Sequence, residues 1–261
     1  MEHRFKKKFG QNFIKDSTII DKIINYSNME QDSLVIEVGP GEGSLTKGLC
    51  SKAKYVLAYE IDTDLKGTLS KLKEVNSNLD IIWGDFLKRN IKEDLGKYDY
   101  KHLYVISNLP YYITTPIITK FIDDKINIDK MIIMVQKEVA TRFLAKPNSR
   151  DYSSLTVFLN YHFEIRKLFD VSRNVFIPKP NVDSSIVELK SKKDKLKVKD
   201  IDLFYKIVRD SIKFKRKNLR NNLKEYNLIK IEEILKKYNI DLTTRAEDLS
   251  LEIFIDISNN L

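Results

Sequence analysis

The chain has 261 residues, of which 42% are hydrophobic, so it can form one large domain, or one medium-sized domain and a small one. Its 46 Lys and Arg exceed its 37 Asp and Glu, and the net charge of +9 fits either a polyanionic partner or a Lys-rich solvated surface. A single cysteine, Cys50, excludes a disulfide framework. His3, His102 and His162 are the only histidines and suggest no metal site.

The N-terminal residues 1–8 are basic, but no apolar stretch follows them, so we expect no secretory signal. Apolar runs throughout the sequence are too short to cross a bilayer, and no membrane partner is expected. The expected location is therefore the cytoplasm. Nothing in the sequence indicates more than a monomer.

From residue 34 to residue 135, short apolar runs alternate with longer helical patterns. The runs predict five buried strands, at residues 34–38, 55–59, 79–83, 103–106 and 131–135. The stretches between them, such as 44–52 and 116–126, are long enough for crossover helices. This alternation predicts an α/β fold with a parallel sheet covered on both faces.

Two further strands are predicted at residues 162–171 and 182–189, joined by a proline-containing connection. We expect them to add an antiparallel edge, which makes a seven-stranded, mostly parallel sheet. The polar stretch 191–195 has no hydrophobic period and is interpreted as a linker. Helical spacing of apolar residues beyond it predicts a small all-helical domain, so residues 1–190 and 191–261 are the expected domains.

Glycines follow the first predicted strand in the order E-x-G-x-G-x-G, from Glu37 to Gly43. Such glycines allow a ligand to approach the backbone closely. Ser44 stands where the third glycine of a dinucleotide fingerprint belongs, so the spacing resembles instead the first motif of class I (Rossmann-like) methyltransferases. Taken alone, the motif also fits a tight turn without a ligand.

Acidic residues at the next two strand ends strengthen the hypothesis of a cofactor site. Glu60 follows the glycines by about 20 residues, where a carboxylate can accept hydrogen bonds from both ribose hydroxyls. Asp85 ends the third strand. Its carboxylate can accept a hydrogen bond from the adenine amine of a cofactor, with the ring of Phe86 alongside. The sequence therefore predicts an S-adenosyl-L-methionine site that includes Gly39, Gly41, Glu60, Ile61, Asp85 and Phe86.

The fourth predicted strand ends in Asn108-Leu109-Pro110-Tyr111. An exocyclic adenine amine is a poor nucleophile, because its lone pair is delocalised into the ring. The Asn108 side-chain oxygen and the Leu109 carbonyl can accept its two hydrogens, Pro110 can stiffen the turn, and Tyr111 can stack on a flipped base. An ordinary Asn-Pro turn is the alternative. We predict methyl transfer that depends mainly on positioning.

The chain resembles the ribosomal RNA adenine N6,N6-dimethyltransferase family over nearly its whole length. The resemblance includes the opening motif at residues 9–14, and it implies cofactor roles for Asn12, Ile14 and Asn108. Segments 136–140, 145–152, 176–184 and 214–223 look like the housekeeping branch, which dimethylates two adjacent adenines near the 3′ end of small-subunit rRNA. The resemblance also implies that Phe176 lies near the target base, although a core position is an equally good interpretation.

Two basic segments are candidates for contacts with RNA phosphates. Lys179 is expected to join them in a positive cleft around Asn108. The candidate residues are Arg4, Lys6, Lys7, Lys8, Lys179, Lys215, Arg216, Lys217 and Arg220. For any single lysine, a solvated surface side chain is the better interpretation, whereas the residues taken together favour the cleft. The implied partner is small-subunit rRNA within an immature small ribosomal subunit.

Three alternative functions remain open at this point. One is large-subunit (23S) rRNA methylation of the macrolide-resistance type. Another is a non-catalytic RNA-binding assembly factor, and the intact motif at Asn108 is evidence against it. The third, adenine methylation of DNA, fits poorly with the helical tail.

Overall fold

The computed structural model describes residues 13–14 and 16–261. The chain divides into two compact units. The first unit consists of Met1–Ala140 and Arg166–Ser191, and the second consists of Thr141–Ile165 and Lys192–Leu261.

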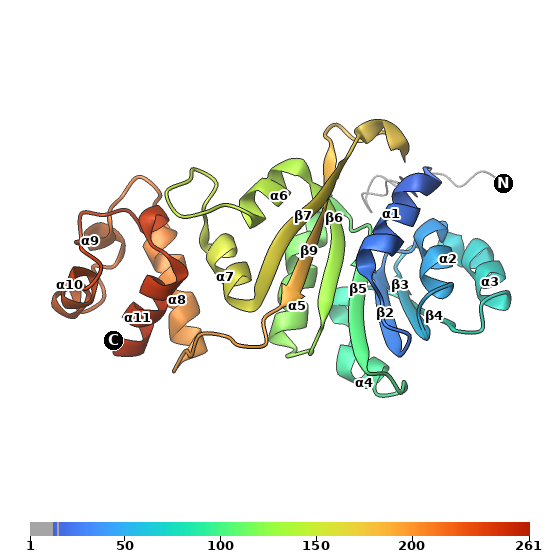
Figure 1. Ribbon diagram of the computed structural model, residues 1–261, viewed down its shortest axis with the longest axis horizontal. Coiled ribbons are helices and arrows are strands. Elements are labelled where there is room, and N and C mark those ends of the chain that lie inside the picture. The colour runs from blue at the N-terminus through green and yellow to red at the C-terminus, as the bar shows by residue number, and fades with distance from the viewer. Residues whose placement is uncertain (1–12, 15) are drawn as a thin grey trace. The chain divides into compact units, whose positions relative to one another are not determined.

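The first unit is organised around a seven-stranded sheet with the order β4-β3-β2-β5-β6-β9-β7 (Figure 1). Its strands are β2 (Ser33–Val38), β3 (Tyr55–Glu60), β4 (Leu79–Trp83), β5 (His102–Ser107), β6 (Lys130–Gln136), β7 (Phe163–Val171) and β9 (Ser184–Ser191). Strands β2 to β6 pair in parallel, whereas β9 pairs antiparallel with β6. This is the mostly parallel α/β sheet with an antiparallel edge that the apolar runs predict.

Helices connect the strands of this sheet. They are α1 (Ser17–Ser27), α2 (Ser44–Cys50), α3 (Lys66–Glu74), α4 (Ile91–Leu95), α5 (Thr114–Asp123) and α6 (Lys137–Phe143). Apolar residues of α1 and α2 share one buried cluster with alternate residues of the central strands, including Ile24, Leu49, Val35, Val56 and Ile106. Alternation places the intervening strand residues on the other face of the sheet. Strands buried on both faces explain why their sequences are continuously apolar.

A second, two-stranded sheet pairs β1 (Phe13–Ile14) with β8 (Phe176–Ile177) in antiparallel register. Ile14 lies opposite Phe176, and both side chains are buried in the cluster beneath α1 and α2. A segment near the N-terminus is therefore held against the connection that precedes β9.

The second unit contains α7 (Ser154–His162), α8 (Ile201–Ile212), α9 (Leu219–Asn222), α10 (Leu228–Lys236) and α11 (Leu251–Asn260). Its core gathers Phe204, Ile207, Leu235 and Phe254. This is the helical tail that the spacing of apolar residues predicts beyond residue 191.

The domain boundary predicted from sequence differs from this division in one respect. Residues Thr141–Ile165, which the prediction left in the N-terminal domain, belong to the second unit. Tyr152, Val157 and Tyr161 pack into the helical core, and a composition shift along the chain cannot reveal such a contact. The predicted linker at 191–195 coincides with the last crossing of the chain from one unit to the other.

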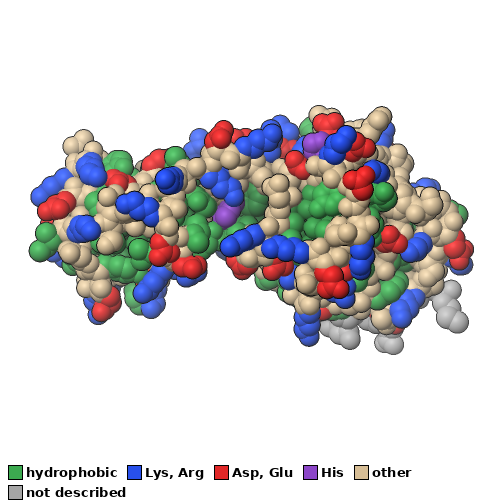
Figure 2. All heavy atoms as spheres, turned by 90° about the horizontal axis from the view of Figure 1, so that it is seen from below, with side chains coloured by type: hydrophobic (Ala, Val, Ile, Leu, Met, Phe, Trp, Pro, Cys, Tyr) green, Lys and Arg blue, Asp and Glu red, His purple; other side chains and the backbone are tan. Residues whose placement is uncertain are grey.

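Basic side chains are dispersed over the face of the molecule that Figure 2 draws. Figure 2 shows Lys and Arg side chains across one face of the molecule, with Asp and Glu side chains between them. Among the described helices, none has the length and apolar character that crossing a membrane requires.

Candidate active site

A pocket of about 300 Å³ lies in the first unit where β2, β3, β4 and β5 end. This is the edge at which open α/β sheets bind ligands, and the volume is at the lower end for ligand sites. It brings together most of the polar residues that end the predicted strands. The residues of the sequence prediction that line it are Ile14, Gly39, Gly41, Glu60, Ile61, Asp85, Phe86, Asn108, Leu109 and Pro110.

The glycine-rich turn after β2 forms one wall of the pocket. Gly39 and Gly41 have φ angles of 77° and 59°, in the left-handed region that side chains disfavour. The Gly39 amide donates to the Tyr59 carbonyl at 2.8 Å, and the Val38 amide donates to Ser107 Oγ at the same distance. The turn is therefore tied to the ends of both neighbouring strands.

Alanine at Gly41 is expected to weaken binding at the S-adenosyl-L-methionine site that the sequence predicts. Its Cβ would lie 2.8 Å from Phe13 Cδ1, so a ring that lines the pocket must move. The left-handed backbone adds about 1–2 kcal/mol of strain. Calorimetric titration with S-adenosylhomocysteine should show an affinity loss of about tenfold or more. Gly67→Ala is the matched control, because nothing lies within 4 Å of its Cβ; that variant should bind normally, and equal affinity in Gly41→Ala would contradict the prediction.

Glu60, at the end of β3, fixes the glycine-rich turn through hydrogen bonds of its carboxylate. Its Oε2 accepts from the Gly41 amide at 3.1 Å, and its Oε1 accepts from the Asp62 amide at 2.8 Å. The side chain is buried, and burial raises the pKa of its carboxyl. Each carboxylate oxygen has more than one lone pair, so both can also accept from a ligand's hydroxyls.

Asp85 and Phe86 form the wall beyond β4. Asp85 Oδ1 accepts from the Leu87 amide at 3.0 Å, which fixes the short helical turn that carries Phe86. The Phe86 ring packs edge-on against Tyr59, with ring centroids 5.0 Å apart. Asp85 and the packed ring of Phe86 both line the pocket, and their role at an adenine subsite stays a prediction.

An ion pair with one buried partner supports this wall: the Asp94 side chain is 1% exposed, whereas that of Arg89 is 38% exposed. Asp94 accepts from the Tyr59 hydroxyl at 3.2 Å and from two nitrogens of Arg89, Nε at 3.1 Å and an Nη at 2.7 Å. The guanidinium of Arg89 keeps the pKa of Asp94 below its usual range despite the cost of burial. Tyr59 and Phe86 are thus held by a charged pair that does not itself line the pocket.

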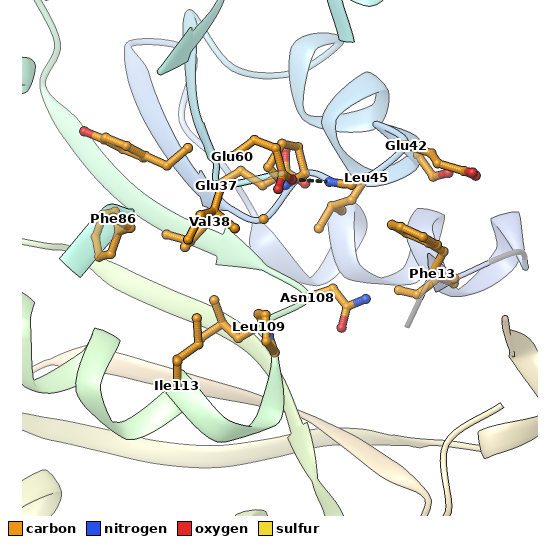
Figure 3. A pocket seen from close by; sticks show the side chains of 18 of the residues that line it. Phe13, Glu37, Val38, Glu42, Leu45, Glu60, Phe86, Asn108, Leu109 and Ile113 are labelled. Atoms are coloured by element: carbon orange, nitrogen blue, oxygen red, sulfur yellow. Dashed lines mark hydrogen bonds between the residues drawn. The ribbon is translucent and has the colours of Figure 1, made fainter. Parts of the chain in front are cut away.

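The predicted reacting motif lies on the opposite side of the pocket from Glu60. Figure 3 shows the Asn108 amide projecting into the pocket between Phe13 and Leu109. Leu109 is buried, whereas Asn108 is only half-buried, as its position beside a substrate would require. The Asn108 side chain thus lies at the same edge of the sheet as Glu60 and Asp85.

Tyr111 and Phe176 are placed differently from the other candidates, since neither lines this pocket. The Tyr111 hydroxyl forms a 2.7 Å hydrogen bond with Ser184 Oγ at the start of β9. Phe176 is only 2% exposed and packs in the core next to Ile14. The core interpretation of Phe176 therefore describes its environment, and in this conformation its ring offers no free face to a base.

The remaining candidates fall into two groups. Asn12, Arg4, Lys6, Lys7 and Lys8 lie outside the described residues. Lys179 is exposed in the first unit, and the second unit exposes Lys215, Arg216, Lys217 and Arg220. Their cleft around Asn108 stays a prediction.

Several other residues that line the pocket were given no role from the sequence, among them Phe13, Glu37, Glu42 and Tyr112. Glu37 was visible as the first position of the glycine motif, but only the glycines were assigned a role. It is 1% exposed, and burial, reinforced by the charge of Glu60, raises the pKa of its carboxyl to about 8. Tyr112 is 60% exposed, and nothing in the sequence distinguished it from Tyr111.

The raised pKa of Glu37 predicts a specific pH dependence. Between its ordinary value of 4.5 and about 8, the folded state keeps a proton that the unfolded state has released. Folding stability should therefore fall as pH rises through this window, by up to about 1.4 kcal/mol per pH unit. The free energy of unfolding is measured in urea at about pH 5.5 and 7.5. Relative to the wild type, Glu37→Gln should be more stable at the higher pH than at the lower. An unchanged difference between the two proteins would contradict this.

The donors and acceptors of the pocket fit an adenosine-containing ligand. A glycine turn with open backbone, a carboxylate that can receive ribose hydroxyls and an Asp–Phe wall lie at three successive strand ends. Among the described residues, no group of three or more His, Cys, Asp or Glu side chains could hold a metal ion.

The order of the strands, the glycine turn and the acidic strand ends together define a class I methyltransferase. A family model described as ribosomal RNA adenine dimethylase matches residues 2–261. The chain therefore belongs to the ribosomal RNA adenine dimethylase family.

Individual relatives agree with this assignment. The chain is 42% identical to the ribosomal RNA small subunit methyltransferase A of Geobacillus sp. (strain WCH70), over 98% of this chain and 91% of the relative. It is also 42% identical to the protein of that name from Onion yellows phytoplasma, over 97% of this chain and 95% of the relative.

Two solved structures share the whole fold. A dimethyladenosine transferase from Plasmodium falciparum superposes with a TM-score of 0.80 at 27% identity, covering 94% of this chain and 95% of the other. The 23S rRNA methyltransferase ErmE has a TM-score of 0.74 at 25% identity, covering 95% of this chain and 99% of its own. Both units of the fold thus recur in these two enzymes, of which ErmE is named for its action on 23S rRNA.

Proposed function

We propose that this enzyme dimethylates the N6 amines of two adjacent adenines near the 3′ end of small-subunit (16S) rRNA, with S-adenosyl-L-methionine as methyl donor. The observation that carries the proposal is the Asn108 amide, which projects into the pocket opposite the carboxylate of Glu60. The small-subunit target is supported by the relatives that match 97–98% of this chain at 42% identity.

The glycine turn, Glu60 and Asp85 are the residues proposed to hold the methyl donor. Glu60 would accept from the ribose hydroxyls while it keeps the Gly41 and Asp62 amides in place. Asp85 would accept from the donor's adenine amine, beside the Phe86 ring. S-adenosylmethionine would supply a sulfonium methyl group, which is electrophilic enough for attack by a neutral nitrogen.

Asn108 and Leu109 are proposed to prepare the target amine. The Asn108 side-chain oxygen and the Leu109 carbonyl each accept one amine hydrogen, and this favours a pyramidal nitrogen with a localised lone pair. Because the proton becomes acidic as the new bond forms, the site needs no strong base, and positioning does most of the catalysis. Tyr111 would stabilise the turn through the hydrogen bond between its hydroxyl and Ser184 of β9.

The proposed partner is the immature small ribosomal subunit, which a monomer meets in the cytoplasm. The exposed basic residues of the second unit and Lys179 would contact phosphates and position the rRNA. Recognition of a folded ribosomal site would then depend mainly on shape.

The target is tested by incubating the purified protein with radiolabelled S-adenosylmethionine and, separately, each undermethylated ribosomal subunit. We expect labelled adenine in the small subunit. Label confined to the large subunit would support the macrolide-resistance alternative, and comparable turnover on duplex DNA would support DNA methylation. If neither the wild type nor Asn108→Ala methylated any of these substrates, the non-catalytic alternative would be favoured.

A further inference from the structure

An aromatic side chain is exposed in the most basic turn of the second unit. Phe214 is 57% exposed in the connection between α8 and α9. Its neighbours Lys213, Lys215, Arg216 and Lys217 are all exposed as well. We call residues 213–217 the basic turn. A single exposed apolar side chain is ordinary, so its significance depends on how it is held and on what surrounds it.

Several hydrogen bonds hold the basic turn, and the side chain of Asn222 makes most of them. Asn222 Nδ2 donates to the carbonyls of Ser211 at 2.6 Å, Phe214 at 3.3 Å and Lys217 at 3.4 Å. The Lys217 amide donates to the Phe214 carbonyl at 2.8 Å, and Lys215 Nζ donates to the Arg150 carbonyl at 3.2 Å. The backbone of the basic turn is therefore already ordered, so ordering it on ligand binding costs little free energy.

The charges around Phe214 restrict what can cover it. Lys213 Nζ lies 5.5 Å from the ring centroid, so a cation already sits over the ring. An apolar protein surface placed on Phe214 would remove these cations from water without giving them partners, which is costly. An RNA strand has a flat base for the ring and phosphates for the cations.

We propose that Phe214 is a stacking platform for one unpaired RNA base, with the cations of the basic turn on the flanking phosphates and Asn222 as the positioning residue. The proposal rests on the proposed function, because it takes the bound molecule to be the ribosomal RNA substrate. It adds a base contact to a region where only phosphate contacts were expected from the sequence. Because every base has an aromatic face, this contact holds the strand without selecting its sequence.

The test is equilibrium binding of the full-length protein to undermethylated small subunits at several salt concentrations between about 50 and 200 mM. Phe214→Ala should weaken binding about 5- to 150-fold, the range typical for loss of one stacked base. Phe214→Trp should restore it. The slope of log affinity against log salt should stay unchanged in Phe214→Ala, whereas Arg216→Ala should reduce it by about one.

The matched control is Ile229→Ala, which removes a side chain that is 75% exposed on α10 of the same unit. The proposal is overturned if Phe214→Ala binds as tightly as Ile229→Ala, or if its loss of affinity is not restored by Trp. Thermal unfolding confirms that each variant is folded.

Binding to large subunits is measured in parallel, so that failure of the proposed function can be distinguished from failure of this inference. If methylation labels only the large subunit, the proposed function is wrong. The binding of Phe214→Ala to the large subunit, compared with that of Ile229→Ala, then tests the stacking platform. If the small subunit is labelled and Phe214→Ala binds it normally, only the stacking platform is wrong.

Discussion

Replacing Asn108 with alanine is expected to lower methyl transfer about 100- to 1,000-fold, as does loss of one preorganised polar group at other reacting centres. The side chain projects into the pocket from the end of β5, and its proposed partner is a hydrogen of the target amine. The loss should appear in single-turnover rates on undermethylated small subunits at saturating methyl donor and RNA.

Two measurements separate this effect from a general loss of structure. The affinity for the small subunit should change little, because phosphate contacts supply most of it. Asn25→Ala removes an exposed asparagine of α1 that does not line the pocket, and this variant should react at the wild-type rate. A loss below about threefold in Asn108→Ala would contradict its proposed role, since about threefold is under 1 kcal/mol.

Glutamine at Glu60 is expected to lower affinity for S-adenosylhomocysteine about 10- to 100-fold. The two carboxylate oxygens each accept from a backbone amide, of Gly41 and of Asp62. Glutamine has only one acceptor oxygen, so its NH₂ group would face one of these amides and one ribose hydroxyl would lose a charged acceptor. Hydrogen bonds to charged groups contribute about 1.5–3 kcal/mol each, which gives the expected range. Calorimetric titration measures it directly.

Glu74→Gln, at the exposed end of α3, removes the same charge away from the pocket and serves as control. It should bind the ligand normally. Wild-type affinity in Glu60→Gln would mean that the carboxylate contributes only to the shape of the turn.

The sheet and the polar strand ends that line the pocket were predictable, because these polar residues directly follow the apolar runs that form the strands. Glu60, Asp85 and Asn108 each stand where an apolar run stops, and parallel strands bring their carboxyl ends to one edge. Strands β7 and β9 were expected side by side at the edge, because the proline-containing connection between them does not read as a crossover helix.

Contacts between distant segments were not predictable. Phe176 lies in an exposed-looking connection, yet it pairs with β1 and is buried. Tyr111 and Tyr112 are adjacent and identical in type, but the turn directs one hydroxyl to Ser184 and leaves the other ring exposed beside the pocket. Tyr152, Val157 and Tyr161 were predicted as part of the sheet domain and pack instead into the helical core. Only the folded chain decides these cases, because each depends on a partner far away in the sequence.

The most direct test of the proposed activity is mass spectrometry of the nucleosides made by the purified protein on small subunits that lack the modification. We predict N6,N6-dimethyladenosine at two adjacent positions near the 3′ end of the rRNA, and its absence when Asn108→Ala replaces the wild type under single-turnover conditions. Dimethyladenosine elsewhere, or monomethyladenosine alone at completion, would contradict the proposed function.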